Sequence, residues 1–107
     1  MTLTLDELAA IIAGRAQSRD GTSYTAQLVG AGSGRIAKKL GEEGVEAALA
    51  CAMGDRTGLR DEAADLLYHL LVALHANGVD VAEVMDELER RTSRGGLEEK
   101  ASRGATG

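Results

Sequence analysis

The sequence of 107 residues contains no proline, no phenylalanine and no tryptophan, and only two tyrosines. A β-sheet normally recruits aromatic and β-branched residues, so this composition disfavours a sheet and favours an all-α fold. Alanine, leucine, glycine and glutamate dominate the remainder, which suits helices better than strands. A small core without large aromatic side chains buries limited area, so we expect a homo-oligomer, at least a dimer.

Cysteine and long apolar runs are equally scarce. Cys51 is the only cysteine, so no disulfide can form within the chain and a reducing compartment is expected. It lies among alanines, where a small buried apolar residue fits, and no base is placed near it for nucleophilic chemistry. No apolar run approaches the roughly 20 residues of a membrane span, and Asp6 and Glu7 do not suit a signal peptide. We expect a cytoplasmic protein without membrane association.

The chain also has no excess of positive charge. It carries 17 acidic and 12 basic residues, for a net charge of −5. Six of the acids lie within two short segments, residues 42–46 and 61–65, while the remainder of the chain is close to neutral. This distribution offers no basic face for nucleic acid, so no nucleic-acid partner is expected.

The two acidic segments suggest a metal site. Glu43 and Glu46 lie three residues apart and share a helix face, as do Glu62 and Asp65. Four carboxylates meeting beside an apolar core would repel one another strongly unless a cation joined them. An oxygen-only set favours Mg²⁺, with Mn²⁺ as a second choice, and Glu42 would reach such a site only at its edge. The alternative interpretation is a solvated acidic helix face.

Several side chains near these acids could contact a phosphorylated substrate. Lys39 shares the helix face of the first two acids, so its ammonium group could hold a phosphate that the metal also contacts. A simple helix salt bridge explains Lys39 equally well. Arg35 and Lys38 precede the same acids and are further candidates. His69 lies four residues after the last acid, although a histidine on a leucine-rich helix is more often partly buried with protein partners.

Apolar periodicity predicts four main helices with short connections, forming a four-helix bundle over residues 1–92. The first helix is predicted to begin at Thr4 with a capping box, and the second to run over residues 35–53. The third is predicted to be capped by Thr57 and to stop at Asn77. The fourth follows Asp80, which forms a second capping box. On the second helix we expect an inward face of Ile36, Leu40, Ala47 or Ala48, Leu49 and Ala52. Residues 93–107 are predicted to form a flexible C-terminal tail.

A glycine cluster at residues 30–34 follows a stretch, residues 23–28, that could form a short helical turn. A phosphate-binding loop is one interpretation of the cluster, but the Lys-Ser/Thr ending is missing and no strand precedes it. We therefore expect a flexible connection at residues 30–34.

These motifs together resemble the phosphoribosyl-ATP pyrophosphatase family, within the all-α nucleotide pyrophosphohydrolase (MazG-like) superfamily. The resemblance covers nearly the whole chain and rests on Ser23-Tyr24-Thr25, on residues 35–43, on Glu46 and on residues 62–72. It implies hydrolysis of the α–β phosphoanhydride of phosphoribosyl-ATP, which gives phosphoribosyl-AMP and pyrophosphate in the second step of L-histidine biosynthesis. It also implies a helical homodimer or a larger assembly.

The resemblance extends to individual positions. Glu43, Glu46, Glu62 and Asp65 match the metal-ligand positions of the superfamily. Glu42 and Glu43 are the catalytic candidates, with Glu42 as an additional ligand or a base that orients water. Tyr24, within the Ser-Tyr-Thr motif, joins the candidates for substrate contact.

Two alternatives stay open at this point. A house-cleaning nucleoside triphosphate pyrophosphohydrolase would use the same acidic site on a different nucleotide, and product analysis separates the two activities. A non-enzymatic helical dimerisation module would carry the same acids as solvated surface groups, and it would not bind Mg²⁺.

Overall fold

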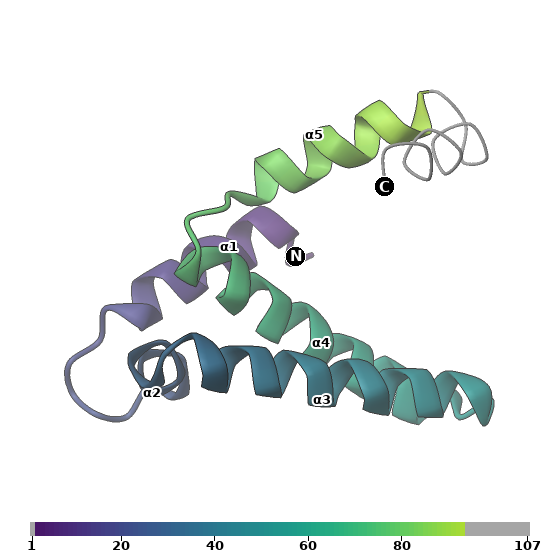
Figure 1. Cartoon of the computed structure of the whole chain (residues 1–107), viewed down its shortest axis with the longest axis horizontal. Coiled ribbons are helices and arrows are strands. Elements are labelled where there is room, and N and C mark those ends of the chain that lie inside the picture. The colour runs from purple at the N-terminus through teal and green to yellow at the C-terminus, as the bar shows by residue number, and fades with distance from the viewer. Residues whose placement is uncertain (1, 94–107) are drawn as a thin grey trace.

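The structure is a computed structural model that describes residues 2–93, and all regular structure in this part of the chain is helical (Figure 1). The elements are α1 (Leu5–Ala16), α2 (Tyr24–Ala31), α3 (Ser33–Ala52), α4 (Arg56–Ala76) and α5 (Val81–Thr92). The all-α prediction is therefore confirmed. The described residues form five helices instead of the four main helices expected, because residues 24–31 form a full helix where a single turn was expected.

Local capping signals explain where two of the helices begin. The backbone N–H of Glu7 donates to Thr4 Oγ1 at 3.1 Å, and the Thr4 N–H donates to Glu7 Oε1 at 2.9 Å. At α5 the Asp80 N–H donates to Glu83 Oε2 at 2.9 Å. Each pair satisfies backbone donors that a helix N-terminus leaves unpaired, so both predicted capping boxes are confirmed.

The predicted N-cap of α4 is wrong by two residues. Asp55, and not Thr57, caps the helix, and its Oδ1 accepts from the Gly58 N–H at 2.9 Å. Aspartate and threonine are both good N-caps, so composition alone does not choose between them. The preceding residue, Gly54, has φ +67, and this turn brings the chain into α4 with Asp55 in the extended conformation of an N-cap.

The glycine cluster is not the flexible connection that we expected. Gly30 lies inside α2 and Gly34 inside α3, and Gly32 alone separates the two helices. Gly32 has φ +96, a conformation that side-chain-bearing residues rarely adopt. One glycine therefore makes the turn, and α2 is held directly against the beginning of α3.

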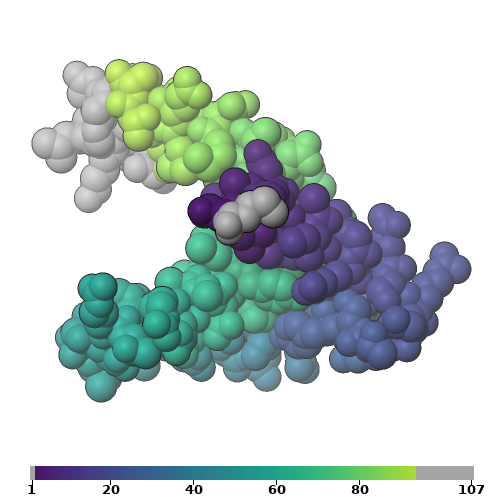
Figure 2. Space-filling view, turned by 180° about the vertical axis from the view of Figure 1, so that it is seen from behind, coloured from purple at the N-terminus to yellow at the C-terminus, as the bar shows by residue number. Residues whose placement is uncertain are grey.

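Helices α3 and α4 form a long antiparallel pair, and α1 and α2 pack at the end of this pair where α3 begins and α4 ends (Figure 1). The core lies at this end and consists of Ile12, Leu28, Ile36, Leu71 and Val72. Helix α5 contacts α1, and Val81 at its first turn packs against the core. In Figure 2 α5 and the distal half of the α3–α4 pair extend as two separate arms. The four-helix bundle type expected from the sequence therefore stays a prediction.

The inner face of α3 differs from the expected one. Ile36 and Ala47 are buried as predicted, but Leu49 is 57% exposed and Ala52 is also exposed. Ala50 is buried in their place. Cys51 is exposed, so the prediction that it fills a buried position is wrong. The largest apolar residues of the distal part of α3 thus face outward from this chain.

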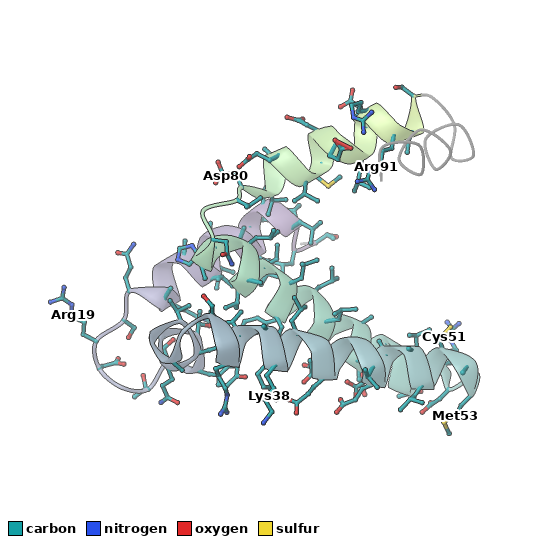
Figure 3. The ribbon with its side chains drawn as sticks, viewed as in Figure 1. Arg19, Lys38, Cys51, Met53, Asp80 and Arg91 are labelled. Atoms are coloured by element: carbon teal, nitrogen blue, oxygen red, sulfur yellow. The ribbon has the colours of Figure 1, made fainter. Side chains whose placement is uncertain are left out.

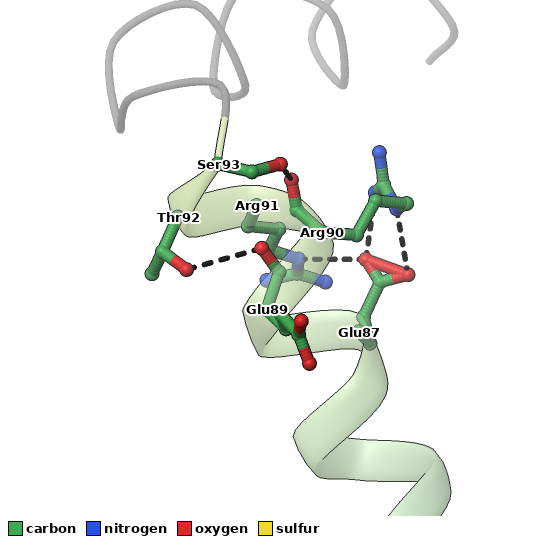
Figure 4. A network of polar contacts seen from close by, with 6 residues as sticks. All are labelled: Glu87, Glu89, Arg90, Arg91, Thr92 and Ser93. Carbon is green, nitrogen blue, oxygen red and sulfur yellow. Dashed lines mark hydrogen bonds and ion pairs between the residues drawn. The ribbon is translucent and has the colours of Figure 1, made fainter.

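The last turns of α5 carry a local charge network (Figure 4). Glu87 accepts hydrogen bonds from Arg90 Nη2 at 2.6 Å and from Arg91 Nε at 3.0 Å. The hydrogen bond from Arg90, followed by that from Arg91, lowers the pKa of Glu87 from 4.5 to about 2. No helix within residues 2–93 is long and apolar enough to cross a membrane. The predicted tail, residues 93–107, lies outside the described residues except for Ser93.

Candidate active site

The acidic residues of α3 and α4 meet because these helices are antiparallel neighbours. Glu43 of α3 and Glu62 and Asp65 of α4 each place a carboxylate oxygen within 4.8 Å of the other two. Glu46, one turn after Glu43, contacts the carboxyl group of Glu62. The structure thus brings together all four expected acids, three in a compact set and Glu46 beside them. We call these four residues the carboxylate cluster.

Two oxygens of the carboxylate cluster are buried without a donor. Glu43 is only 7% exposed. Glu43 Oε2 and Glu62 Oε2 are shielded from solvent, and no residue in the described range donates a hydrogen bond to either. Buried polar atoms are normally hydrogen-bonded, because removing them from water is costly. Unsatisfied carboxylate oxygens in one cluster fit a hard divalent cation, and a set made only of oxygens suits Mg²⁺ or Mn²⁺.

The electrostatics of the carboxylate cluster favour the same assignment. The pKa of Glu62 is raised from 4.5 to about 7, chiefly because the neighbouring carboxyl group of Glu46 favours the protonated, hydrogen-bonding form of Glu62. Burial raises it further, and so does the nearby carboxyl group of Glu43. Without a cation, Glu62 is therefore mostly protonated below about pH 7. A bound cation would replace that proton as the positive charge between the acids.

Lys39 lies beside the carboxylate cluster on α3. Its Nζ is 3.8 Å from Glu43 Oε1 and 3.6 Å from Glu42 Oε1. The side chain of Glu42 is 45% exposed, so it stands at the solvent edge of the acidic site, as its position on the helix predicts. Lys38 projects from α3 into solvent (Figure 3), and Arg35 is exposed near the beginning of the same helix. The cationic candidates therefore line the α3 side of the site.

His69 links α2 to the carboxylate cluster and is only 6% exposed. Its Nδ1 donates to the carbonyl oxygen of Asp65 at 2.8 Å, since a carbonyl oxygen can only accept. Its Nε2 is 3.1 Å from the hydroxyl group of Tyr24. Both ring nitrogens thus have protein partners, and the imidazole connects Tyr24 to the helix turn that carries Asp65. Direct substrate contact by His69 stays a prediction.

A second contact between α2 and α4 was not singled out by sequence reasoning. The hydroxyl groups of Thr25 and Tyr68 are hydrogen-bonded, and Thr25 is only 2% exposed. The rings of Tyr68 and Tyr24 are stacked, with centroids 6.2 Å apart. The sequence feature that could have indicated this contact is the scarcity of aromatic residues. Tyr24 and Tyr68 are the only two in a chain without phenylalanine or tryptophan.

The helical fold and the carboxylate cluster together define the class of protein: an all-α chain with a candidate site for a divalent cation between two antiparallel helices. The family model described as "Phosphoribosyl-ATP pyrophosphohydrolase" matches residues 5–92 of the chain. The chain therefore belongs to the phosphoribosyl-ATP pyrophosphohydrolase family.

Three similar proteins agree with this membership. A protein of Methylobacterium radiotolerans named "Phosphoribosyl-ATP pyrophosphatase" is 59% identical over 100 residues, which cover 94% of each chain. A protein of Methylobacterium nodulans with the same name is 58% identical and covers 95% of each chain. A third, from Allorhizobium ampelinum, also has this name and is 53% identical over 95% of this chain and 98% of its own. The similarity therefore extends over nearly the full length of each protein.

Proposed function

We propose that this protein is a Mg²⁺-dependent phosphoribosyl-ATP pyrophosphatase, with Mn²⁺ as an alternative ion. It would hydrolyse phosphoribosyl-ATP to phosphoribosyl-AMP and pyrophosphate in the second step of L-histidine biosynthesis. The observation that carries the proposal is the pair of buried, donor-free carboxylate oxygens of Glu43 and Glu62 within a family whose relatives have this name. The cytoplasmic location expected from the sequence stays a prediction.

The residues of the site would have different roles, which follow from their positions. Glu43, Glu46, Glu62 and Asp65 would hold the cation, and Glu42, at the exposed edge, would orient the attacking water and accept its proton. When bound, Mg²⁺ supplies charge neutralisation for the phosphates and lowers the pKa of a bound water. Phosphoryl transfer depends mainly on positioning and on neutralising charge, so a set of acids and cations without a covalent nucleophile is sufficient.

Substrate phosphates would lie against the cationic side of α3. Lys39 is held near the carboxylate cluster by ion pairs with Glu42 and Glu43, so its ammonium group is already placed beside the cation site. Arg35 and Lys38 are exposed on the same helix and would contact the remaining phosphate charge.

An assay of pyrophosphate release from phosphoribosyl-ATP tests the proposal. The wild-type protein should require Mg²⁺, and Glu43→Gln or Asp65→Asn should each lower kcat by orders of magnitude while the protein stays folded. A panel of nucleoside triphosphates run in parallel tests the house-cleaning alternative. Hydrolysis of those triphosphates without hydrolysis of phosphoribosyl-ATP would refute the proposal. An absence of Mg²⁺ binding would support a non-enzymatic helical module instead.

We also propose that the protein works as a homodimer or a larger assembly. Leu59, Leu67 and Leu70 are between 37% and 44% exposed on one face of α4. Helix α5 buries none of its residues, although Met85 and Leu88 lie on its apolar side. Such a large apolar surface on a small monomer is typical of an interface. Sedimentation at micromolar concentration should give a species larger than 11.1 kDa, and a purely monomeric protein would contradict this part of the proposal.

A further inference from the structure

The two tyrosines of this chain are gathered at one place, where Tyr68 packs against the edge of the core. Tyr24 of α2 and Tyr68 of α4 are 44 positions apart in sequence, yet their rings stack at an interplanar angle of 26°. The ring of His69 stands nearly perpendicular to both, at 78° to Tyr24 and 86° to Tyr68. Tyr24 nevertheless remains 45% exposed. An aromatic ring that is fixed on one side and open on the other offers a free face for a planar ligand.

Tyr24 also lines a hollow of about 230 Å³, where α2 meets the beginning of α3. Leu28 and Ala31 give it apolar walls, while Gln27 and Arg35 supply hydrogen-bond donors. This combination of an aromatic ring, apolar walls and a few polar groups is typical of sites for a heteroaromatic base.

The position of the hollow along α3 relates it to the carboxylate cluster. Arg35, Lys39 and Glu46 lie at i, i+4 and i+11, which places them along one face of the helix. With a rise of 1.5 Å per residue, residues 35 and 43 are about 12 Å apart along the axis. An extended adenine nucleotide spans a comparable length between its purine ring and its α- and β-phosphates. A nucleotide with its phosphates at the carboxylate cluster would thus place its base near Arg35 and Tyr24.

We propose that this hollow is the purine subsite of the active site, and that the adenine ring of the substrate stacks on Tyr24. This inference rests on the proposed function, because it assumes that the substrate is an adenine nucleotide. The hydrogen bond from Tyr24 to His69 holds the aromatic ring in place, and the bond from His69 to Asp65 ties it to the helix turn of the carboxylate cluster. The subsite is therefore built at a fixed position relative to the cation site.

Two substitutions of Tyr24 separate the contribution of the aromatic ring from that of its hydroxyl group. Both Tyr24→Leu and Tyr24→Phe lose the bond to His69, but only the leucine variant loses the aromatic face. Base–aromatic stacking contributes enough that its loss weakens binding by about 5- to 150-fold. Tyr24→Leu should therefore raise the KM for phosphoribosyl-ATP by a factor in this range, while Tyr24→Phe retains most of the wild-type affinity. Circular dichroism and the Tm of each variant check that the fold is intact.

Inorganic tripolyphosphate provides the matched control ligand, because it has phosphates and no base. As a competitive inhibitor it should have the same Ki for the wild type and for Tyr24→Leu. Equal losses of affinity for phosphoribosyl-ATP and tripolyphosphate in Tyr24→Leu would overturn the assignment, since they would place the defect at the phosphates. An unchanged KM in Tyr24→Leu would overturn it as well.

Intrinsic fluorescence gives a second readout that does not depend on hydrolysis. The chain has no tryptophan and two tyrosines, so Tyr68→Phe leaves Tyr24 as the only tyrosine fluorophore. AMP should quench its emission saturably without Mg²⁺, and ribose 5-phosphate should not. Quenching by AMP in a protein that does not hydrolyse phosphoribosyl-ATP would refute the proposed function and retain the purine subsite. Hydrolysis without quenching would retain the function and refute the subsite.

Discussion

Replacement of Glu62 by glutamine should change the stability of the cation-free protein in a pH-dependent way. The folded-state pKa of Glu62 is about 7, against 4.5 for the unconstrained group, because Glu46, burial and Glu43 all disfavour its ionised form. A raised folded-state pKa contributes stability that is fully present below about pH 4.5 and is lost as the pH rises through about 7. Glutamine resembles the protonated acid and cannot ionise. Glu62→Gln should therefore match the wild type near pH 4.5 and exceed its stability increasingly towards pH 8.

Added Mg²⁺ should reverse this order at pH 8. A group with a pKa of about 7 is about 90% protonated at pH 6 and about 10% protonated at pH 8. Cation binding needs the deprotonated carboxylate, so the apparent Mg²⁺ affinity of the wild type should rise about tenfold per pH unit below pH 7. Glu62→Gln lacks this carboxylate. It should gain less Tm from Mg²⁺ than the wild type and show a shallower pH dependence of cation binding.

Thermal denaturation from pH 4.5 to 8, with EDTA and then with Mg²⁺, measures both effects. The matched control is Glu89→Gln, the same chemical change at an exposed position of α5, which extends apart from the distal half of the α3–α4 pair (Figure 2). Its Tm difference from the wild type should not change when Mg²⁺ is added. A Tm difference between Glu62→Gln and the wild type that is independent of pH in EDTA would refute the reasoning.

Two other predictions concern single side chains. Lys39→Met should raise the KM for phosphoribosyl-ATP by about tenfold, the typical effect of losing a charged hydrogen bond. The effect of Lys38→Met should be smaller, because of the two lysines only Lys39 is ion-paired at the carboxylate cluster. Steady-state kinetics measure this, and equal effects at both lysines would contradict the prediction. Asp55→Ala should lower the free energy of unfolding by about 1 kcal/mol in urea titrations, whereas Thr57→Ala should cost clearly less, because Asp55 is the N-cap of α4. The reverse order would show that the helix begins at Thr57.

Local sequence signals predicted the helices well wherever a single short-range interaction decides a boundary. The two capping boxes are such cases, since each depends only on residues three positions apart. The beginning of α4 was harder to predict, because Asp55 and Thr57 both suit an N-cap and the choice depends on how the chain turns at Gly54. The prediction of a flexible connection around Gly32 was wrong for a similar reason. Several glycines were available there, and only the fold determines which one makes the turn.

The carboxylate cluster was predictable because helical spacing fixes which acids share a face and a short connection makes α3 and α4 antiparallel. The spacing did not reveal how tightly each acid belongs to the cluster, because that depends on the distance and rotation between the helices. It did not reveal the partners of His69 either. Tyr24 lies 45 residues away from His69 in sequence, and no local pattern reports a contact at that distance.

The inner face of α3 shows how a functional site and an interface can make a prediction of burial from hydrophobicity wrong. Ranking by hydrophobicity places Leu49 inside and Glu43 outside, yet Glu43 is 7% exposed and Leu49 is 57% exposed. A buried acid without a donor and an exposed leucine are both unfavourable for an isolated chain. Both exceptions to the pattern are explained if the chain binds a cation at Glu43 and a second copy along its outward apolar surface. Departures from local consistency are expected at functional positions, and here two of them occur on a single helix.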